Sequence, residues 1–451
     1  MTKRIGVPKD LRDFTEVFAA AGFSCYFVGG AVRDSLLGRP VSDWDAATDA
    51  KPEQVRRLFK TVIPTGVQHG TVTVRWRGSS IETTTFRVDG EYKDGRRPES
   101  VRFTSELEED LSRRDFTING MAVDPRTGEV VDPSGGLADL DAGLIRAIGD
   151  PITRFTEDGL RPLRAVRFAA RFGFAIDPAT LAAIPATLAR FRLVSAERIR
   201  DEFTKILVSD RAGEGVLRLD ETGLLAEFLP ELSSCKDVGQ GGPHRYDVFR
   251  HLVAACDAAP PDTVIRLAAL LHDIGKPAKK TEGADGALTF YGHDIESARL
   301  AAEALRRLKY PNSVVDDVVL LVRHHMFDYS DEWTDAAVRR FVSRVGLEYV
   351  ERLAILRLAD TSGMGHGPAD PRSVLPLIDR VEALRAKDQA FGIKDLAIGG
   401  NQLAEIGWPK GPSMGKALSE LLEAVLDDPE LNTERKLIDI AERIKGKYGV
   451  G

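Results

Sequence analysis

Two short stretches decide the fold of the N-terminal part: residues 28–34 read VGGAVRD, and residues 42–48 read SDWDAAT. In the first stretch, Gly29 and Gly30 join an apolar run to a helical segment. Such a junction exposes backbone N–H groups at a positive helix end, which suits a triphosphate. In the second stretch, Asp43 and Asp45 stand two apart at the expected start of a strand, so both carboxylates should point to one side. Paired carboxylates suit a hard cation such as Mg2+, so together the two stretches predict a metal and nucleotide site.

The residues around these stretches alternate strand and helix signals up to about residue 149. Residues 71–76 and 81–87 alternate apolar and polar side chains, as half-buried strands do. Residues 89–100 (DGEYKDGRRPES) are polar and turn-rich, which predicts a loop. From about residue 150 almost every segment has helical periodicity. The sequence therefore predicts an α+β protein with a small mixed α/β head, followed by an elongated all-α neck, body and tail.

Composition narrows the class of protein. The chain has 451 residues, of which 43% are hydrophobic and 29% charged, as expected of a soluble globular protein with several domains. No long uncharged apolar run predicts a membrane helix, the N-terminus does not resemble a secretory signal, and the three cysteines match no disulfide or zinc spacing. We therefore expect a cytoplasmic protein. The net charge of −7 argues against bulk attraction to nucleic acid, so an RNA substrate requires a local basic face.

The stretch EDGLRPLRAVRF (residues 157–168) has a charged residue at every third position, namely Asp158, Arg161, Arg164 and Arg167. On one continuous helix Asp158 and Arg161 are neighbours, whereas Asp158 and Arg167 lie on roughly opposite sides. Pro162 indicates a helix start or a kink. A carboxylate accepts from an exocyclic amino group and a guanidinium donates to a ring nitrogen, and both partners occur in cytosine and adenine. An Asp–Arg pair can therefore select C and A without a template.

Residues 111–120 (LSRRDFTING) supply Arg113, Arg114 and Asp115 before an apolar stretch. An adjacent arginine and aspartate can be an ordinary ion pair. Beside a metal and a triphosphate, however, an arginine would neutralise the charge that develops on departing pyrophosphate.

The order of these motifs resembles that of bacterial class II CCA-adding tRNA nucleotidyltransferases, which belong to the DNA polymerase β-like superfamily. The resemblance extends from about residue 23 to 210 and includes IPTGVQHGTVTV (63–74), DPSGGLADLDAGLIRAIG (132–149) and SAERIRDEFTKIL (195–207). It implies that C, C and A are added from CTP and ATP to tRNA lacking its 3′ CCA, by two-metal phosphoryl transfer with Mg2+ that releases pyrophosphate. The implied metal ligands are Asp43 and Asp45, with Glu82 a candidate third carboxylate, and the implied nucleotide contacts are Gly30, Arg33, Arg114, Asp115, Asp158, Arg161, Arg164 and Arg167.

Four alternatives to CCA addition are weighed against these residues. A bacterial poly(A) polymerase typically carries a GRRF-type segment where this chain has TGVQHGTVTV, which favours CCA addition. The loop of residues 89–100 resembles that of A-adding members, which argues against a CC-only enzyme. A nucleotide hydrolase with a nucleotide-binding head, or a non-catalytic RNA-binding protein, is opposed by the paired aspartates and the complete arginine motifs.

Seven of the eight histidines fall between residues 244 and 366, which predicts a second metal site. Imidazoles and carboxylates that converge from several helices suit Mn, Fe, Ni or Zn, and Mg2+ if oxygen ligands dominate. This stretch resembles the HD phosphohydrolase superfamily. Some CCA-adding enzymes carry such a domain, which can act on phosphomonoesters or 2′,3′-cyclic phosphates. The resemblance implies that His251, His272, Asp273 and Asp360 hold one metal, and that His293, His324 and His325 are additional ligands.

Four regions follow from these patterns: a nucleotidyltransferase head (1–149), a nucleotide-reading and RNA-binding neck (150–237), an HD domain (243–365) and an RNA-binding helical tail (366–451). In the tail, Gly411 to Gly415 open a helix between Lys410 and Lys416. A helix N-terminus with lysines can hold an RNA phosphate. The same residues can equally be a plain helix start with Ser413 as N-cap. The sequence leaves the oligomeric state open.

Overall fold

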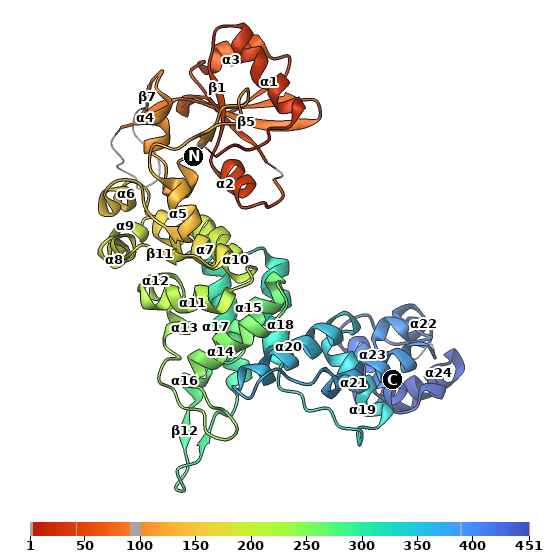
Figure 1. The fold of residues 1–451 in the computed structure, drawn as a ribbon. Coiled ribbons are helices and arrows are strands. Elements are labelled where there is room, and N and C mark those ends of the chain that lie inside the picture. Colours follow the sequence, from red (N-terminus) through yellow and green to blue (C-terminus); the bar gives the residue numbers. More distant parts are fainter. Residues whose placement is uncertain (1–2, 42, 91–100, 388–389, 451) are drawn as a thin grey trace. The chain divides into compact units, whose positions relative to one another are not determined.

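The computed structural model describes residues 3–41, 43–90, 101–387 and 390–450 (Figure 1). The chain divides into two compact units, Met1–Pro230 and Glu231–Gly451. Of the predicted loop at 89–100, residues 91–100 lie outside the described residues. Within the described residues, no helix is both long and apolar enough to cross a membrane.

The first unit begins with a seven-stranded sheet in the order β3-β4-β5-β2-β1-β8-β9. Its strands are β1 (Cys25–Val28), β2 (Asp45–Thr48), β3 (Val62–Gly66), β4 (Thr71–Trp76), β5 (Ser79–Thr85), β8 (Ala122–Val123) and β9 (Val130–Val131). Neighbouring strands are antiparallel except β2 and β5, which run parallel with Ala46 beside Thr83. The strands predicted at 71–76 and 81–87 are present, and the mixed α/β head is confirmed.

Aromatic packing holds the sheet against helices α1 (Lys9–Ala20) and α3 (Pro52–Leu58), which lie beside it in Figure 1. Phe14 of α1 is fully buried and its ring lies 5.0 Å from that of Phe59, which follows α3. On β1, Phe27 packs edge-on against Trp44 at 5.2 Å. The tryptophan between the two aspartates therefore anchors the start of β2 in the core.

The rest of the first unit is mainly helical, with two small pairs of strands, β6 (Arg87–Asp89) with β7 (Val101–Phe103) and β10 (Leu144–Ile145) with β11 (Ala175–Ile176). Its helices are α2 (Gly30–Leu36), α4 (Leu107–Ser112), α5 (Gly136–Ala142), α6 (Pro151–Glu157), α7 (Arg161–Phe172), α8 (Pro178–Ala186), α9 (Leu188–Phe191), α10 (Ala196–Leu207), α11 (Ala212–Glu221) and α12 (Leu224–Phe228). The helix start predicted from Pro162 is confirmed, because α7 begins at Arg161 with a proline in its first turn.

The second unit contains a helical region and a C-terminal helical cluster. After α13 (Pro230–Ser233), which crosses from the first unit, its helices are α14 (Val248–Ala258), α15 (Thr263–Leu271), α16 (Lys276–Lys279), α17 (His293–Arg307), α18 (Asn312–His324), α19 (Asp335–Val345), α20 (Val350–Gly363), α21 (Leu375–Arg385), α22 (Gly400–Glu405), α23 (Pro412–Asp427) and α24 (Glu434–Ile444). One hairpin, β12 (Thr281–Glu282) with β13 (Leu288–Thr289), precedes α17.

The tail packs around its own apolar core, which includes Leu403, Trp408, Leu421 and Leu437. Helix α23 begins as predicted, but its N-cap is Gly411, without a side-chain cap. Ser413 lies inside the helix, so the expectation that Ser413 is the N-cap is wrong. The physical reason is Pro412, whose fixed φ suits the first helical position, so the N-cap is Gly411, two residues before Ser413.

Candidate active sites

A cavity of about 450 Å3 in the first unit brings together all nine residues predicted to bind nucleotide. Its lining is Gly29, Gly30, Arg33, Asp45, Arg113, Arg114, Asp115, Asn119, Asp158, Arg161, Arg164, Arg167, Phe168 and Arg198. Seven arginines against three aspartates make this wall strongly basic. This positive charge is concentrated in the cavity although the net charge of the chain is −7.

The glycine turn at one end of the cavity requires glycine for two reasons. Gly29 has a φ of +72°, a left-handed conformation that side-chain-bearing residues rarely adopt. A Cβ at this position would also lie 3.1 Å from Nη1 of Arg114. Helix α2 begins at the next residue, Gly30. The turn thus lets Arg114, the second residue of the RRD motif (Arg113 to Asp115), approach the backbone at the start of the helix.

A buried polar network holds Arg33 and Arg164 on either side of Asp115. Asn119 donates from Nδ2 to Asp115 Oδ1 at 3.0 Å and accepts a hydrogen bond from Arg33. Arg164 donates from Nε to the other carboxylate oxygen at 2.8 Å. Burial acts to raise the pKa of Asp115, but Arg164 and Asn119 outweigh it and hold the pKa below its ordinary value. Asp115 is therefore ionised and orients its partners rather than exchanging protons.

Asp110 orients Arg113 and Arg114, as Asp115 orients Arg164 and Asn119. This carboxylate is fully buried on α4 and accepts from Arg113 at 2.7 Å and from Arg114 at 3.2 Å. Burial opposes its ionisation, but the two guanidinium groups lower its pKa below the ordinary value. Both arginines are consequently presented to the cavity by a fixed anion behind them.

Asp158 does not lie on the same helix as the arginines that follow it. It caps the C-terminal end of α6, and α7 begins only at Arg161. The expectation from a continuous helix, that Asp158 and Arg167 face opposite ways, is therefore wrong, because the chain breaks at Gly159 and Leu160. Both side chains line the same cavity.

Arg198 is a cavity residue to which the sequence analysis assigned no role. It donates from Nη1 to Asp158 Oδ1 at 3.1 Å and from Nη2 to Oδ2 at 2.7 Å. The backbone N–H of Leu160 donates to Oδ1 at 3.0 Å. Arg161, in turn, is held by Glu157 and by the carbonyl oxygens of Arg154 and Arg113. The sequence signal that could have indicated Arg198 is the stretch SAERIRDEF (residues 195–203), in which Arg198 and Glu202 are one helical turn apart and so face the same side.

Glu202 of α10 is the anion behind the last arginine of the series. It lies 2.5 Å from Arg167 Nε, and both side chains are buried. Burial is the main cause that lowers the pKa of Arg167 to about 10, and Glu202 partly offsets it. Phe168 completes this side of the cavity, because the guanidinium of Arg167 stacks 3.8 Å above its ring.

Three carboxylates, Asp45, Glu82 and Asp43, lie near the start of β2, and of these only Asp45 lines the cavity. Asp45 is the first residue of β2, and the parallel register of β2 and β5 brings Glu82 alongside it. Asp43 precedes the strand and does not line the cavity. The pKa of Asp45 is raised to about 6, first by burial and then by Glu82, with a smaller contribution from Asp43. A carboxylate whose pKa is raised by neighbouring like charges fits a site that a divalent cation would stabilise.

The second site lies in the second unit and brings together side chains from five segments. His251 belongs to α14, His272 and Asp273 follow α15, His293 begins α17, His325 follows α18 and Asp360 belongs to α20. All six are buried. Two sets have donor atoms close enough to share an ion: His251 with His272 and Asp360, and His272 with Asp273 and His325.

Asp273 lies between the two halves of this cluster. Its Oδ2 is 3.3 Å from His272 Nε2 and 3.5 Å from His251 Nε2, whereas its Oδ1 is 3.1 Å from His293 Nε2 and 3.6 Å from His325 Nε2. Two ligands at about 2.1 Å from one ion are separated by about 3 Å or slightly more. These separations fit ligand pairs.

Backbone hydrogen bonds orient three of the imidazoles. Nδ1 of His272, His293 and His325 lies 2.9, 2.8 and 2.7 Å from the carbonyl oxygen three residues earlier. A proton on Nδ1 makes that contact a hydrogen bond and leaves a lone pair on Nε2, which faces a carboxylate oxygen. In that tautomer Nε2 and the carboxylate oxygen are both acceptors, and a cation between them would stabilise the arrangement. Consistently, Asp273 Oδ1 and His293 Nε2 are buried without a hydrogen bond.

The structure corrects one predicted ligand. His324 is the last residue of α18 and belongs to neither set, whereas the next residue, His325, belongs to one of them. Successive residues of a helix point about 100° apart, so only one of two adjacent histidines can face the cluster. The pKa of His324 is lowered, first by burial and then by the positive charges of Arg344 and Arg323.

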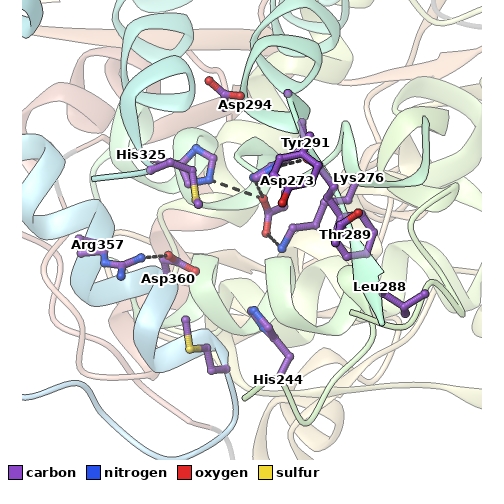
Figure 2. Close-up of a pocket in the computed structure, with 15 residues that line it drawn as sticks. His244, Asp273, Lys276, Leu288, Thr289, Tyr291, Asp294, His325, Arg357 and Asp360 are labelled. Atoms are coloured by element: carbon purple, nitrogen blue, oxygen red, sulfur yellow. Dashed lines mark hydrogen bonds and ion pairs between the residues drawn. The ribbon is translucent and has the colours of Figure 1, made fainter. Parts of the chain in front are cut away.

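The cluster opens into a cavity of about 510 Å3 that also carries two cationic side chains (Figure 2). Lys276 Nζ lies 2.5 Å from Asp273 Oδ2, and Arg357 Nη1 lies 3.0 Å from Asp360 Oδ2. Burial acts to lower the pKa of His272, but Asp273 and Asp360 outweigh it and raise the pKa to about 10. The negative charges of Asp273 and Asp360 thus favour a positive charge beside them.

Three family models match the chain. "Poly A polymerase head domain" matches residues 25–146, "Probable RNA and SrmB-binding site of polymerase A" matches residues 173–236, and "HD domain" matches residues 243–363.

The chain is similar over nearly its whole length to curated CCA-adding enzymes. The enzyme of Latilactobacillus sakei is 35% identical over 95% of this chain and 96% of the relative. That of Geobacillus stearothermophilus is 36% identical over 92% of each chain. The crystal structure of the Bacillus stearothermophilus CCA-adding enzyme in complex with CTP has a TM-score of 0.74 at 30% identity and covers 98% of both chains. A Thermotoga maritima CCA-adding enzyme complexed with tRNA shares the fold, with a TM-score of 0.60 at 19% identity over 97% of this chain and 96% of that one.

Proposed function

The chain belongs to the family of CCA-adding enzymes, and from this premise we propose that it adds C, C and A to the 3′ end of tRNA. It would use CTP and ATP, release pyrophosphate and need no nucleic-acid template. The observation that carries the proposal is the single cavity shared by the glycine turn, Asp45 and seven arginines.

The base is selected by Asp158 and Arg161 at one end of this cavity. A carboxylate has about four acceptor positions. Asp158 uses two on Oδ1, for Leu160 and Arg198, and one on Oδ2, for Arg198. The remaining position accepts the amino group that cytosine and adenine share. Arg161 donates to the adjacent ring nitrogen, where uracil and guanine carry an N–H instead.

The triphosphate lies along the arginines toward the glycine turn. Arg33, Arg114 and the start of α2 bind the phosphates, and Arg164 and Arg167 contact the same nucleotide. Guanidinium groups held from behind by buried carboxylates stabilise the charge on departing pyrophosphate without reorganising.

Asp43 and Asp45, with Glu82 beside Asp45, would hold Mg2+ at the reacting end. When bound, Mg2+ supplies activation of the RNA 3′ hydroxyl and neutralisation of the phosphates. The hydroxyl oxygen attacks the α-phosphorus and gives up its proton to solvent, the bond between the α-phosphorus and the oxygen that bridges to the β-phosphate breaks, and pyrophosphate leaves. The carboxylates keep the reacting oxygens and the phosphate in line.

We further propose that tRNA contacts the neck (residues 150–237) and the tail (residues 366–451), in addition to the head (residues 1–149). The family model over residues 173–236, named for RNA binding, supports the neck assignment. In the tail, Lys410 and Lys416 flank the first turn of α23.

We propose a second activity for residues 243–365, hydrolysis of a phosphate ester. His251, His272, Asp273 and Asp360 would hold one divalent ion, and His293 and His325 would complete a second position around Asp273. A transition metal fits the imidazoles, and Mg2+ fits only if oxygen ligands dominate. When bound, the metal supplies an activated water. Water adds to phosphorus, the ester P–O bond breaks, and the leaving oxygen takes a proton.

One experiment tests the primary function. The purified protein is incubated with tRNA lacking its 3′ CCA, Mg2+ and each nucleoside triphosphate singly, then with CTP and ATP together. We expect C and then a single A; long A tails would identify a poly(A) polymerase, and no incorporation would reject both. Asp45→Ala should abolish addition, whereas Asp141→Ala, at an exposed carboxylate paired with Lys3 in the same unit, should not.

The two activities are separable. His272→Ala should abolish ester hydrolysis and retain CCA addition, and Asp45→Ala should do the reverse. Loss of both activities in either variant would contradict the assignment of one site to each unit.

A further inference from the structure

The cavity over the second metal cluster has a charged floor and an apolar rim. At the floor, Asp273, His325 and Asp360 are buried. Lys276 and Arg357 supply positive charge beside them, as Figure 2 shows through their pairs with Asp273 and Asp360. The apolar residues of the lining are Leu288, Phe290, Tyr291, Met326 and Met364. A ligand that fills this cavity therefore needs an anionic end and an apolar end.

Two side chains of the rim are unusually exposed. Tyr291 is 86% exposed and Met326 is 62% exposed, the two highest values among the large hydrophobic residues that the structure describes. Single exposed apolar side chains are common and carry no meaning by themselves. Here, however, the two most exposed ones line the same cavity, whose floor is a cluster of metal ligands.

The chain position of Tyr291 ties the rim to the floor. Tyr291 lies in the short link between β13 and α17, two residues before His293. His293 is held by its Nδ1 contact with the carbonyl of Phe290, so the backbone on both sides of Tyr291 is fixed. The backbone of Tyr291 is thus held next to His293, and the side chain of Tyr291 is largely exposed.

We propose that Tyr291 is the specificity-determining residue of this cavity and selects phosphate esters that carry a nucleobase. The inference rests on the phosphohydrolase function proposed above. The phosphate would lie at the floor between Lys276 and Arg357, and the base would stack on the ring of Tyr291, with Met326 at its edge. Because every base has a stackable face, this contact selects for a base without selecting which base.

The closing experiment compares substrates with and without a base on the full chain. Hydrolysis of adenosine and uridine 3′-monophosphate is measured beside glycerol 2-phosphate, with Mg2+, Mn2+, Co2+ or Ni2+, for wild type, Tyr291→Ala and Tyr291→Phe. Stacking on an aromatic ring is worth about 1–3 kcal/mol per base, which corresponds to roughly 5- to 140-fold. We expect Tyr291→Ala to raise KM for both nucleotides by a factor in this range, with KM for glycerol 2-phosphate and CCA addition unchanged.

Tyr291→Phe is the matched control, because it keeps the ring and removes only the hydroxyl. It should behave as wild type. Equal effects of Tyr291→Ala on nucleotides and on glycerol 2-phosphate, or no effect on either, would overturn the proposal. So would a preference for one base that disappears with the tyrosine.

A second part of the experiment distinguishes failure of the proposed phosphohydrolase function from failure of the proposed role of Tyr291. If wild type hydrolyses none of the substrates with any of the metals, the phosphohydrolase function is rejected. The stacking role is then decided by calorimetric binding of adenosine 3′-monophosphate to wild type and Tyr291→Ala, where equal affinity rejects it. A short oligoribonucleotide ending in a 3′ phosphate, assayed beside the free nucleotides, shows whether the base belongs to a free nucleotide or to an RNA end.

Discussion

Arg198→Ala is expected to weaken the choice of base while leaving the rate of nucleotide addition nearly unchanged. In the folded protein both oxygens of Asp158 accept from Arg198, at 3.1 and 2.7 Å. With Leu160 as a third donor, a single acceptor position remains for the base. Without Arg198, the carboxylate can rotate about its last bond and offer its lone pairs to water.

The size of the effect follows from these contacts. A hydrogen bond to a charged group contributes about 1.5–3 kcal/mol when buried. The side chains of Arg198 and Asp158 are 21% and 17% exposed, so water makes up part of the free energy that is lost with these hydrogen bonds. Discrimination by a well-oriented pair of contacts to a base edge is worth about 1–3 kcal/mol, and we expect loss of orientation to remove about 1–2 kcal/mol. The ratio of kcat/KM for CTP over UTP should fall roughly 5- to 30-fold.

The assay is single-nucleotide addition to tRNA lacking its 3′ CCA, with CTP and UTP measured separately. Arg198→Lys keeps the charge but not the two-pronged geometry, so it should recover only part of the selectivity. The control is Arg192→Ala, which breaks a similar bidentate pair with Glu227 on the surface of the same unit. An unchanged CTP/UTP ratio together with a fall in kcat for both nucleotides would show that Arg198 binds phosphate and does not position Asp158.

Three further outcomes test other parts of the structure. Gly29→Ala should reduce nucleotide addition at least about tenfold, because an L-residue at positive φ costs about 1–2 kcal/mol and the new Cβ meets Arg114. Gly38→Ala also places an L-residue at positive φ, but in open space, and should lose stability only. Equal activities in the two variants would refute the contact. His325→Ala should lower the amount of bound metal, measured by atomic emission, and reduce ester hydrolysis more than about 100-fold. His324→Ala should change neither quantity, and the opposite pattern would identify His324 as the ligand. Burial raises the pKa of all three cysteine thiols, so iodoacetamide at pH 8 should modify them only after unfolding, and labelling of the native protein seen by mass spectrometry would contradict their burial.

Features carried by neighbouring residues were predictable from the sequence. The GG turn, the RRD motif and the adjacent His272 and Asp273 are each complete within a few positions, and chain connectivity alone keeps such residues together. Helical periodicity likewise predicted α7 and its start near Pro162, because an amphipathic pattern reports which face of one helix is buried. The α/β head and the helical remainder followed from the same local patterns.

Only the tertiary structure decided which distant side chains complete the sites. Glu82 reaches Asp45 through the parallel pairing of β2 and β5, and Arg198 reaches Asp158 through the packing of α10 against α7. The choice of His325 over His324 depends on the rotation of α18 about its axis. Strand order, helix packing and helix rotation are set by long-range burial summed over many residues. Sequence periodicity describes one element at a time, so it cannot supply them.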